Sequence, residues 1–388
     1  MRSFALVIVT GIVSSAFHIC ILAQKPVATD KRESAPGVVL VSRSIDLGRV
    51  EALHGLPEST VVGYPLHCST TGNTFFEVYG QADKPGVSYF PDIYRISDHG
   101  EVTKIAVPSP QDYKQIVAMG LFASEQRLIV LAQVGQPKDP NAHWNKDEKL
   151  FFLVTVAQDG SDQKLIKLAL PFDPMKAAVF NSGEILILGM DPINLAPVLA
   201  LLHSDGSVNR ILDMDFGGLG PSAGSKGIVA VKPGDSNSAA LQRQMLGNLR
   251  TAQFVPWGAE ILLVQPGTKQ PVFRIKDSGI STAVSIHIPD SSLMESILGS
   301  GEKDTWVVRT DSEGSMAKVA NGGVAENSPQ ELFEANPFTG EIIDRLDVRG
   351  PQPGEVSCAA NHTLSAIYYG LPSKPDVPDQ LTYASSLR

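Results

Sequence analysis

The sequence is poor in the features that mark helical proteins and common enzymes. Apolar residues hardly ever recur at the three-to-four-residue spacing of an amphipathic helix, which argues against a helical bundle. There is no His-Glu-x-x-His metal motif, and the one Gly-x-Ser-x-Gly match, Gly220–Gly224, lies in a Gly-rich stretch that is followed by a strand-like run and not by the helix of a nucleophile elbow. Turns that contain Asp, such as Asp311-Ser-Glu-Gly314, lack the series of oxygen ligands of a calcium loop. The missing motifs argue against zinc peptidases and EF-hand proteins, and the lack of a following helix argues against a serine hydrolase of the elbow type.

Positive charge is also scarce. The chain has 32 Lys and Arg against 41 Asp and Glu, a formal net charge of −9, and no basic cluster. Nucleic acid requires a basic face, so we expect no nucleic-acid partner. The Gly-rich stretch Gly217–Lys226 departs from the Walker pattern, because Lys226 is followed by Gly227 and a strand-like run instead of by Ser or Thr and a helix. We interpret it as an insertion loop.

Cysteine is rare, with three residues in all. Cys20 lies in the N-terminal segment, whereas Cys68 and Cys358 occur in similar contexts ahead of a strand that ends in Gly. An oxidising compartment would permit a disulfide between them. We expect two free, buried cysteines, with the disulfide as the alternative, because equivalent positions of neighbouring blades can lie farther apart than the roughly 7 Å that a disulfide allows. A zinc site formed with His67 and His362 is not expected, because the spacing matches no usual ligand pair.

The chain is rich in a repeated unit of two short apolar strands joined by a turn with Gly. The clearest copy runs from Pro197 through Gly206 to Leu212. The turn glycines of the five copies are Gly100, Gly160, Gly206, Gly279 and Gly340. Gly reaches positive φ without a Cβ clash, as tight hairpin turns require. The flanking runs are rich in Val, Ile, Leu and Phe and too short for helices, so the unit predicts β-hairpins.

A further strand precedes each hairpin. The candidates are Asn73–Tyr79, Arg127–Ala132, Glu184–Leu188, Glu260–Val264, Thr305–Arg309 and Thr363–Tyr369. The shortest spacing, from Gly160 to Gly206, fits a four-stranded propeller blade of about 40–50 residues. We therefore predict an all-β fold, a six-bladed β-propeller, with seven blades as the alternative. Because no hairpin follows Thr363–Tyr369, we predict that residues 37–50 complete its blade and that strands from both termini close the ring.

The N-terminus is typical of a secretory signal. Arg2 precedes an apolar run, and Ile21-Leu-Ala23 resembles a cleavage site before Gln24. The alternative is an uncleaved membrane anchor, because the apolar segment is about 20 residues long, enough to cross a bilayer. We assign residues 1–23 to the signal, 24–36 to a linker, 37–373 to the propeller and 374–388 to a C-terminal tail. The expected location is exported, periplasmic or extracellular, with membrane anchoring as the alternative.

Four aromatic residues are candidates for ligand binding. Tyr64, Trp144, Phe216 and Trp257 fall near predicted strand ends or inside insertions, where burial is not the default. Binding clefts on propellers form where such loops converge. The alternative is that some of these side chains simply cover the ends of the blades.

The repeat resembles the NHL/TolB-like six-bladed β-propeller superfamily, from about Gly37 to Gly370. This resemblance implies either a scaffold that binds ligands or proteins, or a metal-dependent lactonase or lyase, whose channel residues have no recognisable counterpart in this chain. We expect a non-catalytic, exported, monomeric propeller that binds a protein, peptide or glycan on its loop face. The alternative is a metal-dependent hydrolase or lyase with its site in the channel. We assign no catalytic residue, cofactor or metal ligand.

Overall fold

The hairpins predicted from the sequence are present in the computed structural model. The residues that the structure describes are 38–45, 61–79, 90–97, 101–139, 141–142, 149–193, 196–213, 249–266, 271–289, 292–301, 304–312, 331–349, 356–360, 363–369 and 381–386. All belong to one compact unit, Ala35–Arg388. The predicted signal segment 1–23, the predicted linker 24–36 and the insertion Phe216–Ser238 lie outside the described residues.

Four of the sheets are four-stranded antiparallel meanders. The first comprises β2 (Val61–Cys68), β3 (Thr74–Tyr79), β4 (Asp92–Ile96) and β5 (Val102–Ile105). The second comprises β6 (Ile116–Ala123), β7 (Arg127–Val134), β8 (Leu150–Ala157) and β9 (Lys164–Leu168). The third comprises β10 (Asp173–Val179), β11 (Ile185–Met190), β12 (Pro197–Leu202) and β13 (Val208–Leu212). The fourth comprises β14 (Gln253–Trp257), β15 (Glu260–Val264), β16 (Pro271–Ile275) and β17 (Ser281–Ser285).

The remaining strands form one nine-stranded sheet. One half is another meander of β18 (Ser292–Ser300), β19 (Trp306–Ser312), β20 (Glu331–Ala335) and β21 (Ile342–Leu346). The other half contains β23 (Val356–Ala360), β24 (Thr363–Tyr369), β25 (Leu381–Ser386), β1 (Val38–Ile45) and β22 (Val348–Arg349). A single parallel pair, Gly299 with Ala359, joins the two halves. Gly is required there, because a Cβ on Gly299 would overlap the carbonyl oxygen of Ala359.

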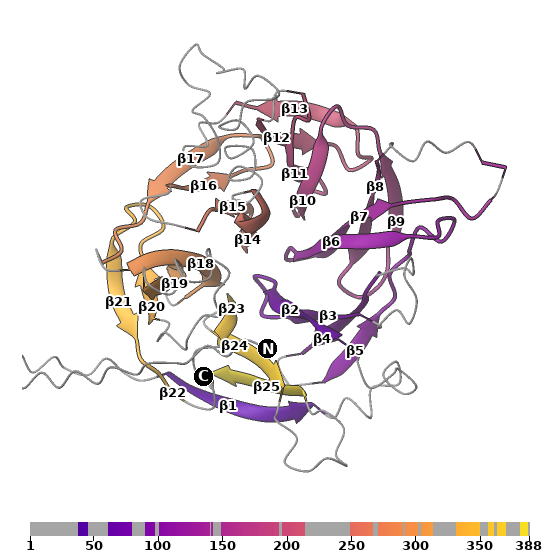
Figure 1. Ribbon diagram of the computed structural model, residues 1–388. Helices are drawn as coiled ribbons and strands as arrows, with labels where there is room; N and C mark the ends of the chain where they lie inside the picture. Colours follow the sequence, from indigo (N-terminus) through magenta and orange to yellow (C-terminus); the bar gives the residue numbers. More distant parts are fainter. Residues whose placement is uncertain are drawn as a thin grey trace, which may run out of the picture. The chain divides into compact units, whose positions relative to one another are not determined.

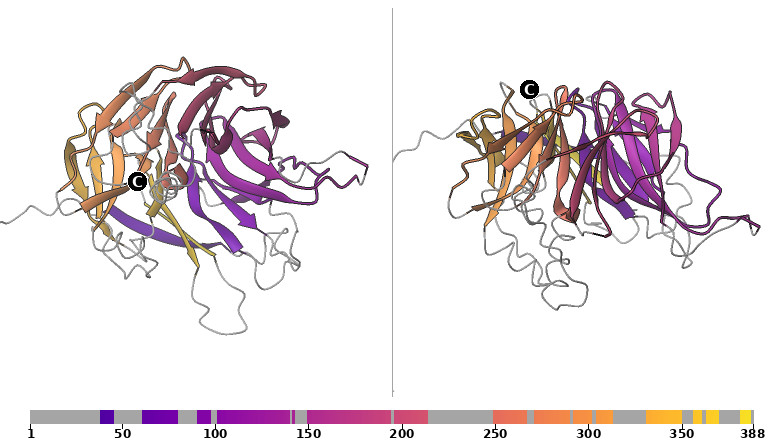
Figure 2. Two further views of the ribbon diagram at one scale, coloured as in Figure 1. Left: turned by 45° about the horizontal axis from the view of Figure 1, so that its top comes forward. Right: turned by 90° about the horizontal axis from the view of Figure 1, so that it is seen from above.

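The sheets stand around a common axis, each with its first strand innermost (Figure 1). We call β2, β6, β10, β14, β18 and β23 the inner strands. Each contacts the next in this order, and β23 contacts β2, so the ring is closed. Figure 2 shows the same twisted sheets from two further directions. The predicted all-β propeller is therefore confirmed. The number of blades stays a prediction, because two of the four-stranded groups are merged into one sheet.

Strands from both ends of the chain close the ring, as predicted. β1 pairs with β25, and β25 pairs with β24. The prediction was wrong in one respect, because residues 374–388 are not merely a tail: Leu381–Ser386 forms the strand that separates β1 from β24. The sequence did not predict this strand because its residues, Leu-Thr-Tyr-Ala-Ser-Ser, alternate only weakly between apolar and polar and no Gly turn lies beside them. Backbone pairing with two neighbours, rather than hydrophobic pattern, defines this strand.

The hairpin turns also link neighbouring sheets. The four described turn glycines, at 160, 206, 279 and 340, all have positive φ, as predicted. Gly340 lies against the end of β17: its carbonyl accepts a hydrogen bond from the His287 amide at 2.9 Å, and a Cβ there would overlap the Ser285 carbonyl. Where the ring closes, a strand pairing takes the place of such a turn contact. β22, which follows β21, pairs with the beginning of β1.

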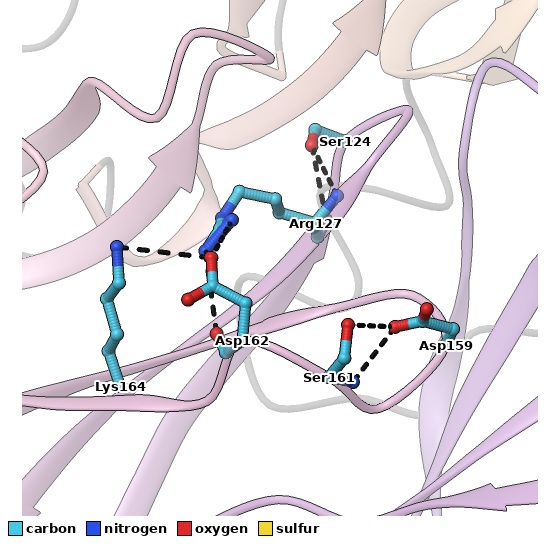
Figure 3. A network of polar contacts seen from close by, with 6 residues as sticks. All are labelled: Ser124, Arg127, Asp159, Ser161, Asp162 and Lys164. Carbon is cyan, nitrogen blue, oxygen red and sulfur yellow. Dashed lines mark hydrogen bonds and ion pairs between the residues drawn. The ribbon is translucent and has the colours of Figure 1, made fainter.

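The core lies between adjacent sheets. In the second, third and fourth sheets, strands two and three are the most buried, and every residue of β11 is buried. Polar contacts fix the turns at the surface (Figure 3). The Arg127 guanidinium donates to the Asp162 carboxylate at 2.7 Å, and the Ser161 hydroxyl donates to Asp159 at 2.6 Å. Exposed contacts of this kind contribute about 0–1 kcal/mol each, so the apolar core dominates the stability.

Candidate functional site

An aromatic cluster lies where the fourth sheet meets the next. Trp257 ends β14, and its ring contacts Trp306 of β19 edge to face at 5.9 Å between centroids. Phe338, in the turn between β20 and β21, lies 6.2 Å from Trp257. The Arg274 guanidinium of β16 lies 4.5 Å from the centroid of Trp257 and 4.6 Å from that of Phe338. We call Trp257, Arg274, Trp306 and Phe338 the Trp257 cluster.

Arg274 holds this cluster in one geometry. Its Nε donates to a Glu260 carboxylate oxygen at 2.8 Å, and its Nη1 donates to the Pro337 carbonyl at 3.3 Å. The arginine side chain is only 12% exposed, so these contacts are shielded from water. Phe338, in contrast, is 68% exposed. The turn Asn336–Gly340 is also fixed, since the Asn336 side chain accepts hydrogen bonds from the amides of Phe338 and Thr339.

The aromatic ring of Phe338 is therefore both exposed to solvent and held in a fixed position by its neighbours. A large exposed apolar side chain with few rotatable bonds loses little entropy when a ligand covers it. Cation–π contacts of a desolvated arginine are worth about 1–2 kcal/mol. The Trp257 cluster therefore has the rigidity and the composition of a recognition surface.

A second group of polar residues lies on the inner strands. The imidazole of His67, in β2, is 21% exposed, and its Nε2 lies 3.9 Å from a carboxylate oxygen of the buried Glu77. Burial, and to a smaller extent the positive charge of Lys176 in β10, lower the pKa of His67 to about 4. Although the pair has the residue types of a salt bridge, His67 is therefore neutral at pH 7. Burial also lowers the pKa of Lys176.

Of the four candidate binding residues, the structure describes Tyr64 and Trp257, which lie on different sheets. Trp257 is half-buried in the cluster described above. Tyr64 lies in β2, on a different sheet, and nothing is described of its side chain. Trp144 and Phe216 lie outside the described residues. The sequence analysis missed Phe338 and Arg274. The run Asn336-Pro-Phe-Thr-Gly340 was assigned only to a hairpin, although an aromatic at the tip of a polar turn could have identified Phe338.

The two cysteines are joined. Cys68 and Cys358 form a disulfide with their Cα atoms 5.8 Å apart, which corrects the expectation of two free thiols. The inner strands β2 and β23 are in contact, so the distance falls within disulfide range. The bonded sulfurs are not available to a zinc ion, and His362 lies outside the described residues. Within the described part of the chain, no three His, Cys, Asp or Glu side chains converge as a metal-ion site. No described helix is long and apolar enough to cross a membrane.

Comparisons with known proteins identified only distantly similar structures. No protein-family model and no curated protein matches the chain. A DUF4623 family protein from Bacteroides eggerthii is similar at 10% identity and a TM-score of 0.37, covering 91% of this chain and 77% of that one. Dipeptidyl peptidase 4 of Porphyromonas gingivalis, at 10% and 0.35, covers 80% and 46%.

An exo-β-1,3-galactanase of Clostridium thermocellum is also similar, at 10% identity and a TM-score of 0.30, covering 73% of this chain and 65% of that one. This chain thus spans less than two thirds of the length of the galactanase and of the peptidase. The superfamily resemblance seen in the sequence is not supported by these comparisons, whereas the propeller fold rests on the strand pairing itself.

Proposed function

We propose that the protein is a non-catalytic propeller of six blades, exported from the cell, that binds a polypeptide partner through the Trp257 cluster. One observation supports the proposal above others: Phe338 is 68% exposed, yet Arg274 holds its ring in place. Binding energy at protein interfaces concentrates in Trp, Tyr and Arg anchors surrounded by groups that exclude water. A glycan is the other ligand class that an exposed aromatic ring suits, and it is an outcome of the test.

The test compares two exposed apolar residues in equivalent hairpin turns. Phe338 lies in the turn between β20 and β21, and Ile280, which is 63% exposed, in the turn between β16 and β17. A photo-crosslinking amino acid at position 338, and separately at 280, is used to capture partners from the exported fraction of the source cells. We expect a polypeptide captured from position 338 and not from 280.

The affinities of substituted chains for the captured polypeptide then test the role of the Phe338 ring. Phe338→Ala should weaken binding of the captured polypeptide tenfold or more, because a central aromatic anchor contributes about 2 kcal/mol or more. Ile280→Ala should leave it unchanged. Equal weakening by both variants would refute the polypeptide proposal. So would binding to a glycan array, without polypeptide binding, that Phe338→Ala abolishes.

Export and a monomeric state are further parts of the proposal. The apolar run that follows Arg2 and the Ile21-Leu-Ala23 motif support cleavage before Gln24. Sequencing the N-terminus of protein recovered from the exported fraction should give Gln24. A chain that keeps residues 1–23 and sediments with membranes would favour the anchored alternative instead.

A further inference from the structure

Most of the inner strands contain a β-bulge or a similar irregularity in their pairing with the second strand of the sheet. The pairing between the first two strands shifts after Gly63 in β2, Ala118 in β6, Pro174 in β10, Met294 in β18 and Val356 in β23. Pairing resumes at His67, Gly120, Lys176, Ser296 and Cys358. Bulges re-aim side chains and are frequent next to binding sites. Gly120 and Lys176 lie at corresponding levels of the ring, opposite Leu131 and Leu188, whereas His67, opposite Phe75, lies nearer to its hairpin turn. Lys176 is nevertheless close enough to lower the pKa of His67.

Few charged side chains lie on the inner strands, and Lys176 alone among the described ones has no ion pair. Asp173 binds the ammonium of Lys149, and Glu295 accepts a hydrogen bond from Arg309 at 2.9 Å. His67 lies beside Glu77. The Lys176 ammonium is partly dehydrated and makes no hydrogen bond or ion pair with any described residue. A dehydrated cation without a counter-charge destabilises the fold, and such groups are candidates for a functional role.

The equivalent position on the adjacent inner strand is open to solvent. Gly120, the equivalent of Lys176 on the adjacent inner strand β6, has no other atom within 4 Å of the position that a Cβ would take. Val117 of the same strand is 48% exposed, so water reaches the inner edge of the sheet there. β6 and β10 are in contact, so Gly120 and Lys176 lie at corresponding levels of neighbouring inner strands.

Partly exposed apolar side chains occur on β6, β10 and β14, close in sequence to Gly120 and Lys176 or on the next inner strand. Met119 and Met175 are the bulged residues of β6 and β10, and Phe254 lies in β14, which contacts β10. All three side chains are partly exposed and pack against the main core cluster. Methionine is flexible and polarisable, and it adapts to irregular apolar ligands. One cation beside Met and Phe side chains matches a molecule that is anionic at one end and apolar at the other.

We propose that the inner edge of β6 and β10 binds an amphipathic carboxylate, with its anionic head on the Lys176 ammonium and its apolar part against Met119, Met175 and Phe254. The neutral imidazole of His67 adds no second positive charge, so one ammonium faces one carboxylate. The small-molecule site shares no residue with the Trp257 cluster, although Phe254 and Trp257 both belong to β14. It can therefore fail or succeed independently of the polypeptide proposal.

The test uses the full mature chain, isothermal titration calorimetry and three probes: octanoate, its uncharged analogue octanamide, and inorganic phosphate. We expect saturable binding of one octanoate per chain. Lys176→Met keeps the length of the side chain and removes the charge, and it should weaken octanoate binding about tenfold or more, since a hydrogen bond to a charged group contributes about 1.5–3 kcal/mol. The matched control is Lys167→Met, which removes the same charge from the exposed face of the outer strand β9 and should leave binding unchanged.

Four results would overturn the proposal: no binding of octanoate, equal binding to Lys176→Met and the unmodified chain, equal binding of octanamide and octanoate, or phosphate binding as tight as that of octanoate. The third result would show that the charge of the probe is unimportant for binding. The fourth would show that its apolar part is unimportant. Circular dichroism and thermal melting of Lys176→Met establish that the variant is folded, so that a loss of binding reports on the ammonium.

Discussion

Cys68, at the end of β2, and Cys358, in β23, are separated by 290 residues in sequence and joined by a disulfide in the fold. The bond connects the inner strands of the first sheet and of the sheet that both chain ends complete. The same ring is closed a second time at its outer edge, where β1 pairs with β25. A covalent link at the axis and a hydrogen-bonded link at the rim therefore hold together the two ends of the propeller.

The covalent link should contribute strongly to stability. A disulfide that closes a loop of hundreds of residues restricts the unfolded chain, and the contribution is about 3–5 kcal/mol. Cys358→Ser should lower the free energy of unfolding by this amount, measured by urea denaturation of the mature chain. Reduced unmodified protein should unfold at the same urea concentration as the variant. An unchanged midpoint in both cases would show that the β1–β25 pairing closes the ring without help.

The hydrogen-bonded link can be removed separately. Deleting residues 25–50 removes β1, so β25 and β22 both lose a partner and present unpaired edges. We expect aggregation or a large loss of thermal stability, measured by light scattering during a thermal ramp. Deletion of residues 25–34 alone is the matched control and should have little effect, because β1 begins at Val38. If the longer deletion melts like the mature chain, closure by β1 is not needed.

The sequence predicted the repeating part of the fold well, because each repeat combines a Gly turn with short apolar runs. Glu260–Val264 and Thr363–Tyr369 match β15 and β24 at both ends. β25 escaped prediction, since its stability comes from pairing with β24 and β1 and not from its own pattern. Non-local pairing of this kind leaves little trace in a local stretch of sequence.

The candidate site was less predictable than the fold. Trp257 was identified as an aromatic near a strand end, but its partners Arg274 and Phe338 come from other strands and turns. Lys176 was not singled out, because a lysine in an alternating strand is usually a solvated residue. Its importance depends on which strand is innermost and where the bulge falls, and both follow only from the assembled ring.

His67 should make stability depend on pH. Its pKa is lowered from 6.5 to about 4 in the folded protein, so between these values the unfolded chain binds a proton that the folded chain does not. The contribution of neutral His67 is fully present above pH 6.5 and is lost as the pH falls towards 4. The loss amounts to ~3 kcal/mol at most. Urea denaturation between pH 7 and pH 4 should show it, and His67→Gln should remove this component; equal pH dependence of the variant and the unmodified chain would refute the assignment.

Lys176 should reduce stability at neutral pH. Its folded-state pKa lies below the usual value because burial disfavours the charged form, so charging it costs free energy in the fold. Lys176→Met should therefore raise Tm by about 1–3 °C, whereas Lys167→Met on the exposed face should not change it. Differential scanning calorimetry at pH 7 measures both. A lower Tm for Lys176→Met would indicate that the ammonium has a stabilising partner, and would weaken the case that it awaits a ligand.

We predict that the protein holds no stoichiometric metal. The described histidines are not arranged as ligands: His67 of β2 lies beside Glu77 of β3, His203 lies in a hairpin turn 3.3 Å from Glu184, and His287 follows β17. Both cysteines of the propeller are bonded to each other, and a catalytic zinc ion requires three protein ligands. Elemental analysis of protein purified without chelator should give well below one zinc, manganese or calcium per chain. Addition of zinc followed by desalting is the control for adventitious binding at the surface. One tightly bound metal per chain, removed by chelation together with a hydrolytic activity, would contradict the binding-protein proposal and favour the metal-dependent hydrolase or lyase.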